Sequence, residues 1–225
     1  MNLAGKACLV TGGAGALGGT VVRKLRADSA KVTVIARGAA QTDRMVFGGV
    51  DLADPAAAEA AVNAAVERLG GLYALINIAG AFRWETLAEG DVATWDVLYS
   101  TNLKTAVCAS KAALPHLIAN GEGRIVNVGA ASAVKAAAGM GAYAASKAGV
   151  AKLTEALSEE VKAKGITVNA VLPSIIDTAA NRADMPDADF GKWVKPEAIA
   201  ALIAFLLSDA AADITGALIP IVGRV

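Results

Sequence analysis

Short segments that are apolar throughout alternate with longer segments of helical period along nearly the whole chain. A strand with one face in water alternates apolar and polar residues, whereas a strand covered on both faces is apolar at every position. The pattern therefore predicts one parallel sheet with helices on both faces, joined by right-handed crossovers. The strands expected on this basis are Ala7–Thr11, Lys31–Ala36, Met45–Val50, Tyr73–Ile78, Arg124–Val128, Ile166–Leu172 and Leu218–Val222. The helices expected between them are Ala14–Ala27, Pro55–Leu69, Thr94–Ala119, Ala142–Ala163 and Pro196–Leu207.

Local signals mark several of these boundaries. Pro55 and Pro196 each open a helix, where a missing N–H costs nothing, and Gly165 follows a helix end as a C-cap. Only Arg37–Arg44 joins the second and third strands, which is too short for a crossover helix, so we expect a loop. Ser174–Val194 is the one long irregular stretch. Because such stretches are often functional, we expect residues 174–194 to form a substrate lid.

Length and charge limit the class of protein. The 225 residues suit one large α/β domain, so residues 1–225 are expected to form a single domain with a doubly wound, seven-stranded parallel sheet. The 21 basic and 21 acidic residues balance, which gives no reason to expect a nucleic acid or a membrane surface as partner. The apolar run Ala198–Leu207 is far shorter than the roughly 20 residues of a membrane span. With no signal peptide and two separated cysteines, the sequence predicts a soluble cytoplasmic protein.

A glycine-rich turn follows the first strand at once and opens a helix. It reads Thr11-Gly12-Gly13-Ala14-Gly15-Ala16-Leu17-Gly18. Glycines let the backbone turn sharply and approach a pyrophosphate held at the positive end of the helix. Glycine also makes ordinary tight turns, but the strand–turn–helix context favours dinucleotide binding in a Rossmann-type domain.

The end of the second strand bears on which nucleotide is bound. A free ribose 2′-hydroxyl favours an acidic residue there, whereas a 2′-phosphate favours arginine. The sequence reads Ala36-Arg37 with no acid, which predicts NADP, with NAD as the alternative. The alternative interpretation is that Arg37 is an ordinary solvated loop residue that does not bind the nucleotide.

Tyr143 and Lys147 are four residues apart on an expected helix and therefore share a face. A neighbouring cation is expected to lower the pKa of the tyrosine, as general acid–base catalysis requires. Such a pair is by itself common on solvated helix faces. The single histidine, His116, has no partner residues that would complete a metal site, and no metal is expected.

Taken in order, these residues resemble the short-chain dehydrogenase/reductase family along the whole chain. Asp51-Leu52, Asn77 to Gly80, Asn102, Tyr143 with Lys147, and Pro173 to Thr178 are each similar to one of its motifs. The resemblance implies an NAD(P)-dependent oxidoreductase with Tyr143, Lys147 and Asn102 as catalytic residues. The cofactor-binding residues it implies are Thr11, Gly12, Gly15, Ala16, Leu17, Gly18, Arg37, Asp51, Leu52, Asn77, Ala79, Gly80, Tyr143, Lys147, Pro173, Ile176 and Thr178.

The sequence departs from the family pattern at three positions. Ala16 replaces a glycine of the first turn, Ser174 replaces the glycine after Pro173, and Ala130 stands where the family has a catalytic serine. Ser132, two residues later, would substitute for that serine only if the segment is bulged. The missing serine and the lid sequence resemble a subgroup, the quinonoid dihydropteridine reductases. That subgroup, however, has an acid at the end of the second strand and tryptophan at the position of Phe82.

Three functions follow from the resemblance. The leading hypothesis is an NADP-dependent reductase of a carbonyl or a quinonoid or imine-like acceptor. The alternative is a 3-oxoacyl thioester or other ketone reductase. A non-enzymatic NADP-binding regulator would be expected to have lost the Tyr/Lys pair, which is intact here. The partner is thus a small-molecule substrate, and the alanine-rich helices that carry Asn102 and Tyr143 predict a homodimer or homotetramer.

Overall fold

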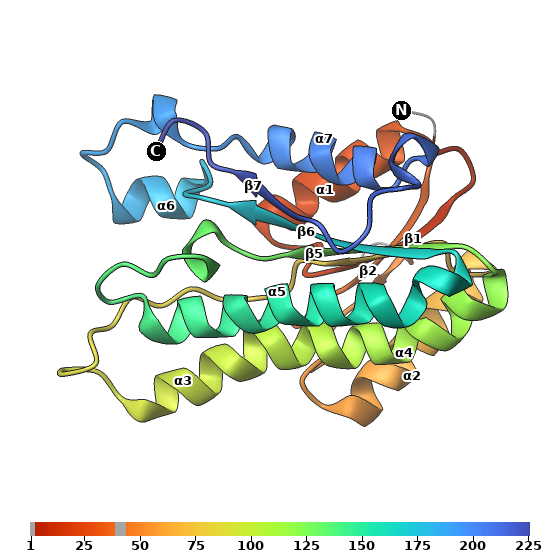
Figure 1. Cartoon of the computed structure of the whole chain (residues 1–225), viewed down its shortest axis with the longest axis horizontal. Coiled ribbons are helices and arrows are strands. Elements are labelled where there is room, and N and C mark those ends of the chain that lie inside the picture. The colour runs from red at the N-terminus through yellow and green to blue at the C-terminus, as the bar shows by residue number, and fades with distance from the viewer. Residues whose placement is uncertain (1–2, 39–43) are drawn as a thin grey trace.

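The computed structural model describes residues 3–38 and 44–225. Within them, seven strands form one parallel sheet in the order β3-β2-β1-β4-β5-β6-β7 (Figure 1). Strand order reverses between β1 and β4, as in doubly wound folds. The expected α/β architecture is therefore confirmed. The strands are β1 (Ala7–Thr11), β2 (Lys31–Ile35), β3 (Val46–Phe47), β4 (Ala74–Asn77), β5 (Gly123–Val128), β6 (Ile166–Pro173) and β7 (Leu218–Ile221).

Helices cover both faces of the sheet, as the apolar strands require (Figure 1). Helices α1 and α7 lie on one face, and α2, α4 and α5 lie on the other. The helices are α1 (Ala16–Ala27), α2 (Pro55–Leu69), α3 (Val92–Leu98), α4 (Thr105–Asn120), α5 (Gly141–Val161), α6 (Ala179–Asp184) and α7 (Pro196–Leu206).

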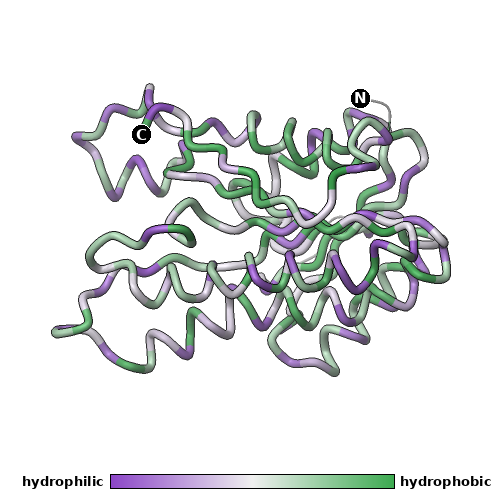
Figure 2. Tube along the Cα trace, viewed as in Figure 1, coloured by the Kyte–Doolittle hydropathy of each residue, from purple (hydrophilic) through white to green (hydrophobic). Residues whose placement is uncertain are grey.

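Each central strand contributes to two hydrophobic cores, one on each side of the sheet. In β1, Cys8 and Val10 pack toward α1 and α7, whereas Leu9 packs toward α2 and α4. The central strands are accordingly largely hydrophobic along the trace, as is α7 (Figure 2). Fully burying one aliphatic side chain contributes about 1.5–3 kcal/mol, so the two cores fix the positions of the strand ends.

Two helix boundaries agree with their sequence signals. Pro55 is the first residue of α2, and the Asp54 side chain caps that helix by accepting from the N–H of Ala56 at 2.9 Å. Gly165 has a φ of +73° directly after the turn that follows α5, which only glycine adopts without strain.

Three expected elements differ from the structure. The third strand spans only Val46–Phe47 instead of Met45–Val50, because two glycines follow and Gly49 has a φ of +70°. The expected single helix Thr94–Ala119 is α3, a π-helical turn at Tyr99–Lys104, and α4. The expected irregular stretch after β6 contains α6. The loop expected at Arg37–Arg44 lies largely outside the described residues.

No helix in residues 3–38 and 44–225 is both long enough and apolar enough to cross a membrane.

Candidate active site

The carboxyl ends of the parallel strands meet at one edge of the sheet, where a cavity of about 1420 Å³ opens. In doubly wound sheets this edge is where ligands bind. Fourteen of the residues expected at the site line this cavity, and they come from the ends of five strands and the start of α5. They are Gly12, Gly15, Ala16, Leu17, Gly18, Arg37, Asp51, Leu52, Ala79, Gly80, Tyr143, Lys147, Pro173 and Ile176.

The glycine-rich turn is closely packed against the loop after β4. Gly12 has a φ of +69°, and a Cβ there would lie 2.8 Å from Cα of Ala79. A Cβ on Gly18 would lie 2.2 Å from the carbonyl oxygen of Gly12, so neither position has room for a side chain. Gly15 is the N-cap of α1 and provides no side-chain cap. The first-turn N–H groups of α1 therefore form a cradle suited to a pyrophosphate.

Thr11, Asn77 and Thr178 do not line the cavity, although the resemblance implied that they bind cofactor. The Thr11 hydroxyl accepts from the N–H groups of Ile78 and Ala79 at 3.1 and 3.2 Å. The amide of Asn77 is buried and donates to Asn127 at 2.9 Å and to Ser110 at 3.1 Å. Thr178 caps α6. These residues hold the strand ends and the start of α6 in place.

At the outer end of the cavity, β2 ends without an acidic side chain. Ala36 is buried and donates its N–H to Phe47, and the exposed Arg37 follows it on the cavity wall. The Asp51 carboxylate, also on this wall, accepts from the N–H of Ala53 at 3.0 Å. This end of the cavity therefore carries one positive and one negative side chain, Arg37 and Asp51.

Tyr143 lies in the first turn of α5 and is packed edge-to-face against Phe82, with ring centroids 4.9 Å apart. Burial raises the pKa of the Tyr143 phenol to about 12. The phenol therefore keeps its proton at neutral pH and is available as a proton donor.

Lys147 is buried one helical turn beyond Tyr143. Its ammonium group donates to the carbonyl oxygen of Val128 at 2.8 Å, and burial lowers its pKa to about 8. The expectation that Lys147 lowers the pKa of Tyr143 is wrong for this structure. Burial acts on both groups and favours the neutral form of each, so it raises the pKa of Tyr143 and lowers that of Lys147.

Asn102 lies in the π-helical turn and is buried beside the cavity rather than lining it. Its side chain accepts from the N–H of Ala81 at 2.7 Å and donates to the carbonyl of Ala81 and to the Ser146 hydroxyl at 2.9 Å. Ser146 in turn donates to the backbone carbonyl of Tyr143 at 2.7 Å. Asn102 thus ties the loop after β4 to the start of α5.

Gly80 makes this arrangement possible. A Cβ at this position would lie 2.7 Å from Oδ1 of Asn102 and 3.5 Å from the ammonium nitrogen of Lys147. The absence of a side chain at Gly80 therefore allows the loop after β4, the π-helical turn and α5 to converge. π-Helical turns within α-helices occur frequently at functional sites.

Ala130 and Ser132 both line the cavity near the start of α5. Residues 131–133 form one 3₁₀ turn, so Ser132 does not continue the extended strand β5. The Ser132 hydroxyl is buried and has no hydrogen-bond partner among the described residues. An unpartnered buried hydroxyl costs about 1–3 kcal/mol.

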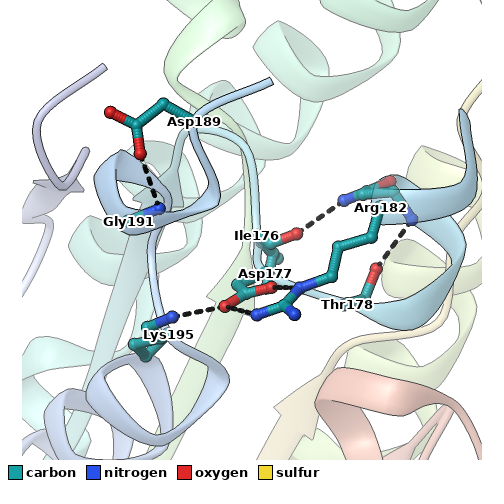
Figure 3. Close-up of polar contacts among 8 residues, drawn as sticks. Ile176, Asp177, Thr178, Arg182, Asp189, Gly191 and Lys195 are labelled. Carbon is teal, nitrogen blue, oxygen red and sulfur yellow. Dashed lines mark hydrogen bonds and ion pairs between the residues drawn. The ribbon is translucent and has the colours of Figure 1, made fainter. Parts of the chain in front are cut away.

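The segment after β6 is held together by ion pairs around Asp177 (Figure 3). Arg182 donates to both carboxylate oxygens of Asp177, and Lys195, just before α7, pairs with the same group. These cations hold the pKa of Asp177 well below its usual range. Arg182 also lies over the Phe190 ring, with its guanidinium carbon 4.8 Å from the ring centroid. The segment from Ile176 to Lys195 is therefore stabilised by contacts between its own residues, and part of it lines the cavity.

The sequence did not identify several residues at the inner end of the cavity. They are Phe82, Arg83, Trp84, Lys135, Met140 and Met185. Five of them follow Gly80 or precede Tyr143, so their place next to these two recognisable segments was the available signal, whereas Met185 follows α6. Among the described residues, no group of three His, Cys, Asp or Glu side chains is placed to hold a metal ion.

Comparison with known proteins agrees with this geometry. A family model described as short chain dehydrogenase matches residues 6–189. A 3-oxoacyl-(acyl-carrier-protein) reductase of Vibrio cholerae is 34% identical over 96% of this chain and 95% of its own. A 4-formylbenzenesulfonate dehydrogenase of Comamonas testosteroni is 32% identical over 99% of this chain and 98% of its own. A 2,5-dichloro-2,5-cyclohexadiene-1,4-diol dehydrogenase of Sphingobium indicum is 32% identical over 99% and 96%.

Proposed function

The chain belongs to the short-chain dehydrogenase/reductase family, and from this premise we propose that it is an NADPH-dependent reductase. Its acceptor in this proposal is a strongly electrophilic carbonyl or a quinonoid or imine-like group, such as a quinonoid dihydropterin. The observation that carries the proposal is Ala130, which lines the cavity near Tyr143 at the position where the family has a hydroxyl donor.

The residues around the cavity fit a dinucleotide. Gly12, Gly15 and Gly18 form the cradle for the pyrophosphate, and Arg37 is suited to the 2′-phosphate. Asp51 and Leu52 are suited to the adenine, and Ala79, Gly80, Pro173 and Ile176 to the nicotinamide side. When bound there, a reduced nicotinamide supplies the hydride that the reaction transfers.

Tyr143 is the proton donor in this proposal. Hydride addition to a carbonyl carbon leaves an alkoxide, which is a stronger base than tyrosinate, so proton transfer from a phenol of pKa about 12 is downhill. Lys147, whose ammonium nitrogen lies 3.5 Å from where a Cβ on Gly80 would be, is placed to bind the ribose hydroxyls. Asn102 positions the start of α5 through Ser146. Residues 174–194 serve as the substrate lid.

The missing hydroxyl argues for an electrophilic acceptor. Removing one preorganised donor from the developing oxyanion typically costs about 10²–10³ in rate. A strongly electrophilic acceptor depends less on a hydrogen-bond donor that stabilises the developing negative charge, whereas reduction of an aliphatic ketone depends on that donor strongly. Ala130 therefore favours quinonoid, imine-like or activated carbonyl acceptors over simple ketones.

Ser132 favours a second candidate, a 3-oxoacyl thioester reductase. Its unpartnered hydroxyl would supply the missing donor if the side chain rotates into the cavity. The relative from Vibrio cholerae, named for that activity, is consistent with this alternative.

NADPH oxidation over a panel of acceptors distinguishes the candidates. The panel contains a quinonoid dihydropterin, a quinone, an aliphatic ketone and an acetoacetyl thioester. We expect kcat/KM on the quinonoid acceptors to exceed that on the ketone, and Ala130→Ser to narrow the ratio by about tenfold or more. Rapid thioester reduction with no dihydropterin activity would support the second candidate.

Two further measurements complete this test. Tyr143→Phe should abolish turnover on every acceptor while NADPH binding, measured by isothermal titration, is kept. NADPH binding without turnover of any acceptor by the parent protein would instead indicate an NADP-binding regulator.

A further inference from the structure

Two aromatic side chains at the inner end of the cavity are exposed to an unusual degree. Phe82 is 58% exposed and Trp84 is 59% exposed, and both line the cavity. Large aromatic side chains normally bury most of their surface, and leaving it in water costs roughly 25 cal/mol per Å². An exposed aromatic pair in a concave site is therefore a surface that a ligand covers.

Both rings are held in place by their neighbours. The indole N–H of Trp84 donates to the carbonyl of Ala138 at 3.0 Å. One face of the indole lies directly on Gly139, where a Cβ would be 2.1 Å from Cε2 of the ring. Phe82 is packed edge-to-face against Tyr143. Because the rings are already fixed, a flat molecule that stacks on them loses little further side-chain entropy.

Two cations lie beside the aromatic pair. Arg83 follows Phe82 and donates to the Thr94 hydroxyl at 3.1 Å, and the exposed Lys135, from the segment between β5 and α5, lines the same cavity. Neither forms an ion pair within the described ranges. Glu85, the acid nearest to Arg83 in sequence, accepts from the N–H of Asp91 and also interacts electrostatically with Arg83. The acid that lines the cavity at this end together with Arg83 and Lys135 is Asp184 in α6.

We propose that the substrate is a flat conjugated ring with an anionic substituent. The ring stacks against Phe82 and Trp84 beside Tyr143, and the anion lies at Arg83 and Lys135. Met140 and Met185, whose flexible side chains also line this end, adapt to the ring edge. The proposal rests on the reductase function above and names its substrate class. For an aromatic aldehyde, hydride adds to the carbonyl carbon, Tyr143 protonates the oxygen, and the products are a benzylic alcohol and NADP⁺.

Three aldehydes separate ring shape from charge. Para-carboxybenzaldehyde is flat and anionic, para-formylbenzamide is flat and neutral, and formylcyclohexanecarboxylate is anionic but not flat. We expect kcat/KM with NADPH to be highest for the first and at least about tenfold lower for each of the others. Raising the salt concentration should reduce the advantage over the amide and leave the advantage over the cyclohexane in place.

Two variants assign these preferences to residues. Phe82→Leu should lower kcat/KM about fivefold more for the two flat aldehydes than for the cyclohexane aldehyde. Lys135→Gln should lower kcat/KM about fivefold more for the two anionic aldehydes than for the amide. Lys164→Gln, which removes an exposed lysine after α5, is the matched charge control and should change none of the three. Unchanged NADPH affinity and melting temperature show that each variant is folded.

A binding measurement separates failure of this proposal from failure of the reductase function. Para-(hydroxymethyl)benzoate, the alcohol product, should bind the NADP⁺-loaded protein in isothermal titration, and Lys135→Gln should weaken that binding. If no acceptor in either panel oxidises NADPH, the reductase function is wrong. If the three aldehydes react equally and the benzoate does not bind, the reductase function stands and the anionic ring is wrong.

Discussion

At the scale of single residues, Arg37 is suited to set the nucleotide preference. It follows β2 on the cavity wall, and the preceding residue, Ala36, has no carboxylate to repel a 2′-phosphate. We expect the parent protein to bind NADPH at least about tenfold more tightly than NADH, and Arg37→Asp to reverse that order. Isothermal titration with both nucleotides measures this, and equal affinities in the parent protein would contradict it.

Lys147 should leave a signature in the pH dependence of stability. Its pKa is about 8 in the folded protein and near 10.5 in the unfolded chain, so the unfolded chain binds more protons between these values. Stability therefore rises with pH in that window. Between pH 7.5 and 9 this contribution amounts to about 1 kcal/mol, and Lys147→Met should remove it.

Two groups of opposite sign act near the upper end of this window. Burial raises the pKa values of Cys8 and Cys108, so stability falls as these thiols ionise in the unfolded chain, but this contribution is the same in the parent protein and in Lys147→Met. Urea unfolding of the parent protein and of Lys147→Met across pH 7.5–9 measures the difference in their free energies of unfolding directly. A difference that stays constant across the window would show that Lys147 titrates normally.

At the scale of elements, the first turn of α1 depends on two adjacent glycines in different ways. A Cβ on Gly18 would meet backbone atoms at 2.2 Å, whereas the nearest atom to a Cβ on Gly19 is the end of the Arg23 side chain at 3.5 Å. Gly18→Ala should therefore displace the glycine-rich turn and weaken NADPH binding at least about tenfold.

Gly19→Ala is the matched control for that change. It lies in the same helix, and replacing glycine by alanine there should raise the free energy of unfolding by up to about 1 kcal/mol without loss of NADPH binding. Thermal unfolding and nucleotide titration of both variants test the pair. Equal loss of binding in both would mean that α1 tolerates no side chain at either position.

At the scale of the whole molecule, the outer surface of α3, the π-helical turn and α4 is unusually apolar. Val97, Tyr99, Val107 and Ile118 are all exposed there. Val107 and Ile118 are eleven residues apart, three turns of α4, and so face the same side. The family resemblance implies that this helix and α5 pair with their mates across a two-fold axis, and we expect at least a homodimer through this surface.

Val107→Glu should dissociate that dimer, because it places a charge in an apolar contact. Light scattering at micromolar concentration should give a multimeric mass for the parent protein and a lower mass for the variant. Leu87→Glu, at an exposed position outside these helices, should leave the mass unchanged. A monomeric parent protein would contradict the expected oligomer.

Much of the fold was predictable because the strands and helices follow from the pattern of apolar and polar residues that are close together in the chain. The apolar runs predicted all seven strands, and the bounds of β1 and α2 are those expected. Periodicity did not reveal the π-helical turn at Tyr99–Lys104, since one extra residue in a helical turn barely changes the hydrophobic pattern. The short helix α6 was missed although Thr178 is an N-cap residue, because six residues give too little periodicity.

The sequence by itself determined the α/β architecture, the position of the glycine-rich turn and the shared face of Tyr143 and Lys147. These depend on residues close together in the chain, and on strand order rules that hold for most chains of this pattern. Only the tertiary structure decided that Thr11 and Asn77 hold the cavity wall without lining it, and that burial rather than the neighbouring lysine governs the pKa of Tyr143. It also decided that Phe82, Trp84 and Lys135, distant in sequence, line one end of the cavity. Burial and long-range contact depend on how the whole chain packs, and no local pattern encodes that.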